Sequence, residues 1–271
     1  MKAVQGMTAT MLWASFILAG VQGGLASAQD MMDQVDLSTP AFTTAEMTRD
    51  ELAALLEAAE LGSSIDLSGK RLNGLDLSGL DFRGANLRGA YLNNAKLNGA
   101  KLDDAILDQV WALRSDFSHA SLIGAKLFGA QMRDANFASA DLSRARVTAD
   151  LTRANFRDAK LVDADLSADM KNQSMGLMRA TLSSADLTGA DLSGALLSRV
   201  KLEFAKLTGA NLSGADLMLA ELAGADLSGA TIAGANFNQA DVASAKLIGL
   251  IGADQAIDLD KARNLDRARL K

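Results

Sequence analysis

The sequence predicts an all-β solenoid, and three observations support this fold class. From Leu67 to Val147 a large apolar residue stands at every fifth position except Ala112, and the same spacing resumes later in the chain. Alanine usually stands two places before each of these residues. The chain is 49% hydrophobic but only 4% aromatic, so its core must be built from small side chains. A period of five fits neither a helix nor an alternating strand, so the chain must bend within every unit.

The repeated unit reads Ala-(Asp/Asn)-Leu-x-x, as in residues 85–89, Ala-Asn-Leu-Arg-Gly. We call the large residue the centre of the unit. In an extended stretch, the alanine and the centre point to the same side because they are two positions apart, and the remaining residues face solvent. Four such bends would close a square coil of twenty residues, with the alanines and centres inside.

The five-residue register extends over a predicted β-helix at 63–252 and is interrupted twice. It shortens by one residue near 147–151, and it breaks again at 167–176, which is polar and irregular. Regular centres resume at Leu177, so we expect a bulge or loop at 170–176. The units on either side of these faults suffice for about nine coils.

Units such as 185–189, Ala-Asp-Leu-Thr-Gly, and 225–229, Ala-Asp-Leu-Ser-Gly, resemble the pentapeptide-repeat proteins. The resemblance covers about residues 65–250. It implies a right-handed quadrilateral β-helix with four repeats in each coil.

Three phenylalanines test the size of the coil. Phe117 and Phe137 are centres twenty residues apart, and Phe156 follows after nineteen, across the first fault. If coils stack, these rings should form an aromatic column in the core, because aromatic rings pack favourably on one another.

Both ends of a solenoid expose unpaired backbone and apolar core, so we expect caps. Thr48 and Glu51 form a capping-box pattern, which predicts a capping helix over 48–62 that ends at Gly62. Residues 253–271 carry spaced leucines without a clear helix start and form a predicted C-terminal capping segment. In one branch of the family a C-terminal helix carries the dimer interface, so the resemblance leaves a homodimer possible.

Residues 1–28 differ in composition from the rest of the chain. Lys2 precedes an apolar stretch, and the small residues 26–28, Ala-Ser-Ala, precede Gln29. This pattern is typical of a signal peptide cleaved near Ala28, which predicts a periplasmic or secreted protein with an N-terminal extension at 29–47. The alternative is a retained membrane anchor, although the stretch is short for a spanning helix.

The sequence offers little for catalysis or for binding a cofactor or metal. There is no cysteine, and the net charge of -6 argues against a broad grip on nucleic acid or anionic lipid. His119 is the single histidine and has no obvious partner set. Acidic pairs such as Asp103 and Asp104 would need a desolvated cleft, which a convex rod does not provide. We therefore expect a protein that is not an enzyme and has no cofactor.

Large residues at outward positions are candidates for protein contacts. Tyr91 and Trp111 lie twenty residues apart and should stack on one face. The first candidate patch joins them to nearby apolar residues, namely Ile106, Ile123 and Phe128. The alternative is that residues 29–48 or the cap fold back over this surface.

A second candidate patch comprises Leu196, Met218 and Leu219 on adjacent coils of the C-terminal half. It could form a subunit contact, and crowding by the C-terminal tail is the alternative.

Three functions follow from these features. The first is an exported, non-catalytic rod that binds a protein or supports the cell envelope. The second comes from the resemblance, because some pentapeptide-repeat proteins protect DNA gyrase, a topoisomerase, by imitating DNA. Such mimicry needs an acidic face, whereas one face here changes sign, reading Asp66, Asn86, Ile106, Lys126 and Arg146. The third is a secreted effector that acts on a host.

Overall fold

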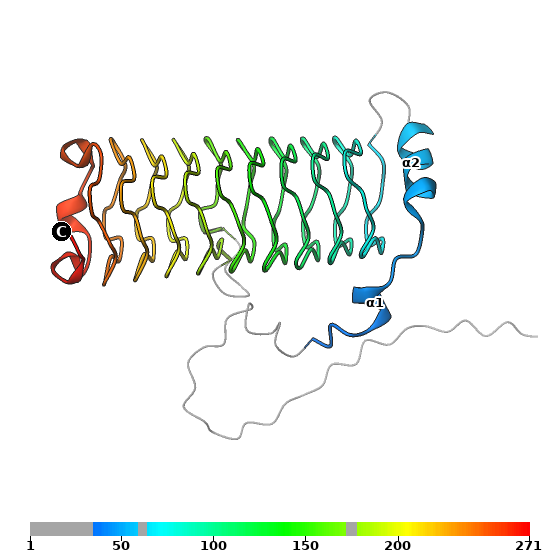
Figure 1. Ribbon diagram of the computed structural model, residues 1–271, viewed down its shortest axis with the longest axis horizontal. Helices are drawn as coiled ribbons and strands as arrows, with labels where there is room; N and C mark the ends of the chain where they lie inside the picture. The colour runs from blue at the N-terminus through cyan, green and yellow to red at the C-terminus, as the bar shows by residue number, and fades with distance from the viewer. Residues whose placement is uncertain (1–34, 59–63, 172–177) are drawn as a thin grey trace, which may run out of the picture.

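The computed structural model describes residues 35–58, 64–171 and 178–271, most of which form a straight stack of coils (Figure 1). Parallel bridges join residues in the same place on successive coils, as between Asp66 and Asn86. Within the described residues these bridges run along four faces, which we name after their first members: the Asp66, Arg71, Asp76 and Asp81 faces. Each wall of a coil is a single bridge flanked by turns, which is shorter than an ordinary strand.

A tight turn forms each corner and explains why the period is five. In the turn after Phe82, the N–H of Ala85 donates to the carbonyl oxygen of Phe82 at 2.9 Å. The third residue of the turn, Gly84, has a φ of 66°. A positive φ at this position alone matches a type II turn, which favours glycine there. Elsewhere the same place is taken by polar residues such as Asn94, with a φ of 56°.

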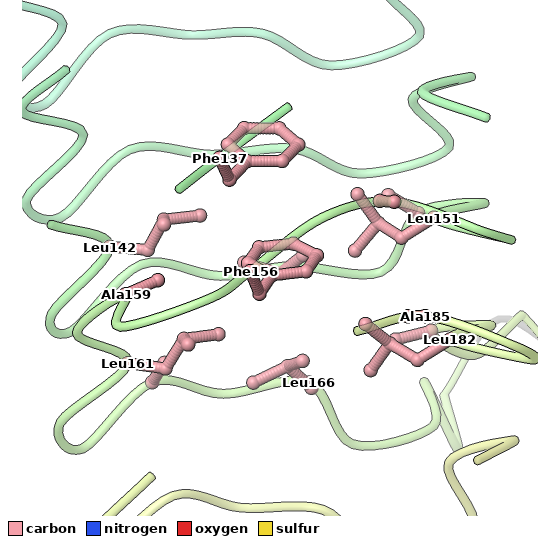
Figure 2. Packing of buried hydrophobic residues seen from close by; sticks show 14 of the residues in the cluster. Phe137, Leu142, Leu151, Phe156, Ala159, Leu161, Leu166, Leu182 and Ala185 are labelled. Atoms are coloured by element: carbon pink, nitrogen blue, oxygen red, sulfur yellow. The ribbon is translucent and has the colours of Figure 1, made fainter. Parts of the chain in front are cut away.

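The core consists of the alanines and centres, as the repeat predicts. Ala85 and Leu87 are 0% and 1% exposed. The rings of Phe117 and Phe137 are stacked with centroids 4.9 Å apart, and Phe156 continues the column at 4.8 Å from Phe137. Figure 2 shows the last two rings one above the other among leucines. The spacing of the phenylalanines therefore predicted the number of residues in a coil correctly.

Where an Asp or Asn stands before a centre, its side chain can stabilise both its own turn and the next coil, as at Asp66. Asp66 Oδ1 accepts a hydrogen bond from the N–H of Ser68 at 3.0 Å, forming an Asx turn. The same oxygen accepts from Asn86 Nδ2, one coil further on, at 2.9 Å. The preference for Asp and Asn at this position is thus structural.

The first register fault lies where the sequence places it. On the Asp66 face, Lys126 bridges Arg146 after twenty residues, whereas on the Arg71 face Gln131 bridges Asp150 after nineteen. The corner between Arg146 and Asp150 is therefore one residue shorter than the others, and the faces on either side of it remain aligned.

At the second fault the ladder resumes at Thr181. Asp150 bridges Thr181, and Leu182 is the buried centre that follows. Figure 2 shows Leu182 packed below Leu151. After Asp165, the next described residue along the chain that forms a bridge is Thr181. Leu177 and most of the expected loop at 170–176 lie outside the described residues.

Helix α2 (Arg49–Ala58) covers the first coil (Figure 1). The capping box is present, with the Thr48 N–H donating to Glu51 Oε2 at 2.7 Å and the Glu51 N–H donating to Thr48 Oγ1 at 3.2 Å. Leu52 is fully buried, but Leu55 is 48% exposed, so the apolar stripe of the helix packs only in part. The expected end at Gly62 lies outside the described residues.

Residues 35–47, which we call the strap, run along the side of the stack before α2 begins (Figure 1). They include the single-turn helix α1 (Pro40–Thr43), which is not among the elements expected from the sequence. Pro40 occupies the first turn, where its fixed φ favours a helix start.

The C-terminal end is closed by three short 3₁₀ helices, namely η2 (Ala253–Gln255), η3 (Leu259–Lys261) and η4 (Leu265–Arg267). After each of them the chain bridges the preceding coil, at Ile257, Arg263 and Arg269 respectively. The bridging residues are six apart, so the tail forms a final partial coil with longer corners.

Candidate protein-interaction surface

The aromatic pair predicted on one face is present, but the strap covers it. Tyr91 and Trp111 bridge each other on the Arg71 face. The ring of Phe42 contacts both edge-on, with centroids 5.3 Å from Tyr91 and 4.8 Å from Trp111. Both rings are half-buried. The interpretation of these two residues as an open patch is therefore wrong, and the alternative, a segment within 29–48 folding back, describes the structure.

Two buried asparagines hold the backbone of the strap. Asn73 and Asn93 stand directly after centres on successive coils and are 4% and 3% exposed. Asn73 Nδ2 donates to the carbonyl oxygens of Ala41 at 3.0 Å and Thr44 at 3.3 Å. Asn93 Nδ2 donates to the carbonyl oxygen of Phe42 at 3.2 Å. Carbonyl groups are common to all residues. These contacts therefore depend on where the backbone of the strap lies and not on its side chains.

The side-chain oxygens of the same asparagines face the coil stack. Asn73 Oδ1 accepts from the N–H of Asn93 at 3.1 Å, and Asn93 Oδ1 accepts from the N–H of Leu113 at 2.9 Å. Each amide is therefore fixed by the coils, with its donor group directed at the strap.

A charged contact ends the strap. Glu46 lies 2.8 Å from Lys70 Nζ and 3.3 Å from Arg71 Nε, and its N–H donates to the carbonyl oxygen of Arg71 at 2.9 Å. The hydrogen bond from Lys70 is the main reason that the pKa of Glu46 is lowered, and the contact with Arg71 acts in the same direction.

At its other end the strap borders a cavity of about 290 Å³. The lining residues are Val35, Leu37, Leu113, Arg114, Arg133, Asp134 and Arg153. Two of the arginines are paired with acids of the rod, since Arg153 Nε lies 2.7 Å from Asp134 Oδ1 and Arg133 Nε lies 2.5 Å from Asp150 Oδ2. The cavity is therefore not a simple basic site for an anion.

The other members of the first candidate patch do not join the aromatic pair on its face. Ile106 lies on the Asp66 face. Ile123 and Phe128 lie in turns that follow the Asp81 and Asp66 faces, where their N–H groups donate to Asp103 Oδ1 at 3.1 Å and Asp108 Oδ1 at 3.0 Å. All three are half-buried. Twenty-residue spacing identified neighbours along one face, but it did not justify grouping residues from different faces.

The second candidate patch is more open. Leu196 is 46% exposed and Met218 is 38% exposed, while Leu219 is half-buried. Leu196 bridges Asp216, and the N–H of Met218 donates to Asp216 Oδ1 at 3.2 Å, which places the group on neighbouring coils. The C-terminal tail joins the same face only at Ile257, beyond another coil. Crowding by the described tail thus does not explain these residues.

Phe204 was missed by the sequence analysis although it is the most exposed large apolar residue among those described, at 68%. It adopts a φ of 58° at a corner where glycine or a polar residue is usual. Its ring covers Gly224 on the next coil, where an added Cβ would lie 2.6 Å from Phe204 Cδ1. A bulky residue at the last position of a repeat was the available signal.

The residues considered for chemistry have structural places. His119 is exposed at a corner with a φ of 58°. Asp103 accepts hydrogen bonds from the next coil, including that from Ile123. In the described parts of the chain, no three histidine, cysteine or acidic residues gather in a way that could hold a metal ion. Over the same residues, no helix has the length and apolar character needed to cross a membrane.

Charges on the Asp76 face pair along the stack. Lys246 Nζ lies 2.7 Å from Asp226 Oδ2, and Lys206 Nζ lies 3.8 Å from Asp186 Oδ2. Neighbouring coils thus neutralise each other, and these residues form no continuous acidic stripe.

Comparison with known proteins identifies the repeat. The sequence profile of pentapeptide repeats matches residues 71–109, 115–148, 149–168, 177–214 and 220–250. None of the curated protein sequences matches the chain.

Among solved structures, HetL, a pentapeptide repeat protein involved in heterocyst differentiation regulation in the cyanobacterium Nostoc, is 28% identical. The match covers 83% of this chain and 96% of HetL, with a TM-score of 0.35. QnrB1, a plasmid-mediated fluoroquinolone resistance protein, is 21% identical over 77% of this chain and 90% of its own, with a TM-score of 0.43. A pentapeptide repeat protein of the Arabidopsis thaliana thylakoid lumen is 30% identical over 59% of this chain and 67% of its own, with a TM-score of 0.12. These TM-scores are too low to support an argument about function. The assignment of the chain to a family therefore rests on the match to the repeat profile.

Proposed function

Since the chain belongs to the pentapeptide-repeat family, we propose that it is a non-catalytic, exported rod whose side binds another protein. About nine four-sided coils of the right-handed β-helix, capped by α2, form the rod in this proposal. It acts as a binding surface or as a scaffold of the cell envelope. Solenoids suit this role because their stacked coils create long, rigid surfaces.

One observation carries the proposal: the side of the rod already holds a peptide segment. The strap is bound through an aromatic contact at Phe42, two asparagine clamps and an ion pair at Glu46. A surface that binds a segment of its own chain in this way has the chemistry needed to bind a segment of another protein.

Two other functions are less well supported. Imitation of DNA to protect a topoisomerase needs a continuous negative face, whereas acids such as Asp226 are paired with lysines one coil away. The action of a secreted effector on a host is compatible with export, but no described residue points to a host target.

Export is tested by fractionating cells that produce the full chain and by measuring the mass of the recovered protein. The expected result is a periplasmic or secreted chain that begins near Gln29. Full-length protein retained in the cytoplasm would contradict the export part of the proposal.

Protein binding is tested by photo-crosslinking in intact cells. A photoreactive residue is placed at Phe204 or Met218, which are exposed apolar positions, and at the exposed Ser139 as a matched control. A discrete crosslinked partner from the apolar positions and none from the control is the expected outcome. Identical patterns from all three positions would argue against a specific surface.

A further inference from the structure

The strap-binding surface has the composition of a peptide-recognition site. It offers an aromatic pair, Tyr91 and Trp111, two backbone clamps, Asn73 and Asn93, and a basic pair adjoining them. The basic pair consists of Lys70 and Arg71. Together these groups recognise an aromatic side chain, the carbonyl groups around it, and a carboxylate four residues further along.

The coils form this site without help from the strap. The N–H of Tyr91 donates to the carbonyl oxygen of Lys70 at 2.8 Å, and the N–H of Trp111 donates to that of Ala90 at 2.9 Å. Asn93 is fixed by its bond to the N–H of Leu113. Because these bonds lie within the ladder, the site would keep its geometry if the strap left.

The contacts that hold the strap against the coils are individually weak. Helix α1 is a single turn with no buried residue, and such a short helix has little stability of its own. Exposed ion pairs like that of Glu46 typically contribute less than about 1 kcal/mol. Apolar contacts come from Phe42, whose ring meets Tyr91 and Trp111, and from Met47, which packs against the core at the end of the strap.

The cap is held separately from the strap. Arg49 donates to the carbonyl oxygens of Asp76 and Ser78, the latter at 3.3 Å, and Leu52 is fully buried. The Thr48–Glu51 capping box belongs to α2 alone. Residues before Met47 can thus leave while α2 still covers the first coil, because Met47 itself packs against the core.

We propose that the strap is an internal competitor at a peptide-binding site. The partner is a protein segment that presents an aromatic residue followed four positions later by Asp or Glu, as Phe42 and Glu46 do. This partner gains access when it displaces the strap, so the strap sets the threshold for binding. The inference rests on the proposed function as a protein-binding rod and names the class of ligand.

The test uses the full chain and a fluorescent synthetic peptide with the sequence of residues 36–48 of this protein. In the double variant F42A/E46Q the strap loses its aromatic and charged contacts, while the site is unchanged. Fluorescence anisotropy should show that the peptide binds the double variant at least about tenfold more tightly than the wild-type chain, because 1.4 kcal/mol of lost competition corresponds to that factor.

Specificity is checked with matched variants. Adding Trp111→Leu to the double variant should abolish binding, whereas adding Ser139→Ala should leave it unchanged, because Ser139 is exposed at the corner that follows the Asp76 face, whereas Trp111 lies on the Arg71 face. A peptide in which the phenylalanine is replaced by alanine should not bind.

Two results would overturn the inference. One is the absence of peptide binding to a double variant whose thermal unfolding matches that of the wild type. The other is equal binding to wild type and double variant, which would mean that the strap does not compete. Failure of the proposed function looks different: the peptide would bind as expected, while cells contain no protein that crosslinks to the rod.

Discussion

The ring of Phe137 lies 6° from parallel to the ring of Phe117, with their centroids 4.9 Å apart. The next ring, Phe156, repeats the arrangement at 4.8 Å and 5°. Each of these rings is 0% exposed, so the column fills the middle of the core across the first register fault.

Replacing the middle ring should be costly. Phe137→Ala removes contacts to both neighbours and leaves a cavity that stacked walls cannot easily close, so we expect a loss of about 3–5 kcal/mol in the free energy of unfolding. Phe137→Leu keeps most of the volume and should cost clearly less. Denaturant unfolding followed by circular dichroism measures both, and equal losses would show that the column is not specifically packed.

Two glycine substitutions should separate backbone strain from steric conflict. Gly209 has a φ of 66° and open space where a Cβ would lie, so Gly209→Ala should cost about 1 kcal/mol from backbone strain alone. Gly252 has a φ of 73°, and a Cβ added to it would lie 3.0 Å from the Cα and 2.7 Å from the Cβ of Ala233. Gly252→Ala should therefore destabilise the C-terminal coil more strongly. Thermal unfolding compares the two, and the reverse order would refute this account of the corner.

Removing the apolar contact of the cap should cause self-association. Leu52 is fully buried under α2, so Leu52→Asp places a charge against the first coil and should uncover that end of the stack. Light scattering is expected to detect oligomers or aggregates. Leu55→Asp is the control, because Leu55 is already 48% exposed and its replacement should leave the protein in its wild-type state.

Docking of the strap should weaken in acid. The pKa of Glu46 is lowered from its ordinary value of 4.5, chiefly by the hydrogen bond from Lys70. A carboxyl whose pKa is lower when docked stabilises docking above its ordinary pKa and loses that contribution as the pH falls through the docked pKa. The protection factor of the Glu46 amide against hydrogen exchange should thus fall below pH 4.5. In Glu46→Gln the protection should be lower at neutral pH and nearly independent of acid, and an acid response equal to that of the wild type would exclude Glu46 as the cause.

The sequence predicted the features that repeat. The inward pair follows from the five-residue spacing, whereas the coil of four repeats was implied by the resemblance to the pentapeptide-repeat proteins. The phenylalanine column tested that coil size, because in a stack each side chain meets its counterpart on the next coil. The Thr48–Glu51 capping box is a local signal and was equally readable. Val110 and Ala112 reverse the usual order of a small and then a large inward residue, and both are buried.

Features with neither a period nor a local sequence signal were not predicted. Nothing in the spacing shows that Phe42 docks on Trp111, because a single-turn helix leaves no pattern and its contacts join distant parts of the chain. The buried asparagines, twenty residues apart at 73 and 93, were a usable signal beside the aromatic pair. A C-terminal capping segment was predicted over 253–271, but its internal structure was not, because its units are six residues long and too few to establish a period by themselves.

The interruption between Asp165 and Thr181 has a consequence for engineering. The walls continue on either side, with Asp150 joined to Thr181 and Asp165 joined to Leu196, although the chain spends many residues in between. At this corner the number of residues in the chain can thus increase without lengthening the stack of coils. A foreign sequence grafted there would lie at a defined position along the axis of the stack. Adding or deleting whole coils would shift that position in steps of about 4.8 Å.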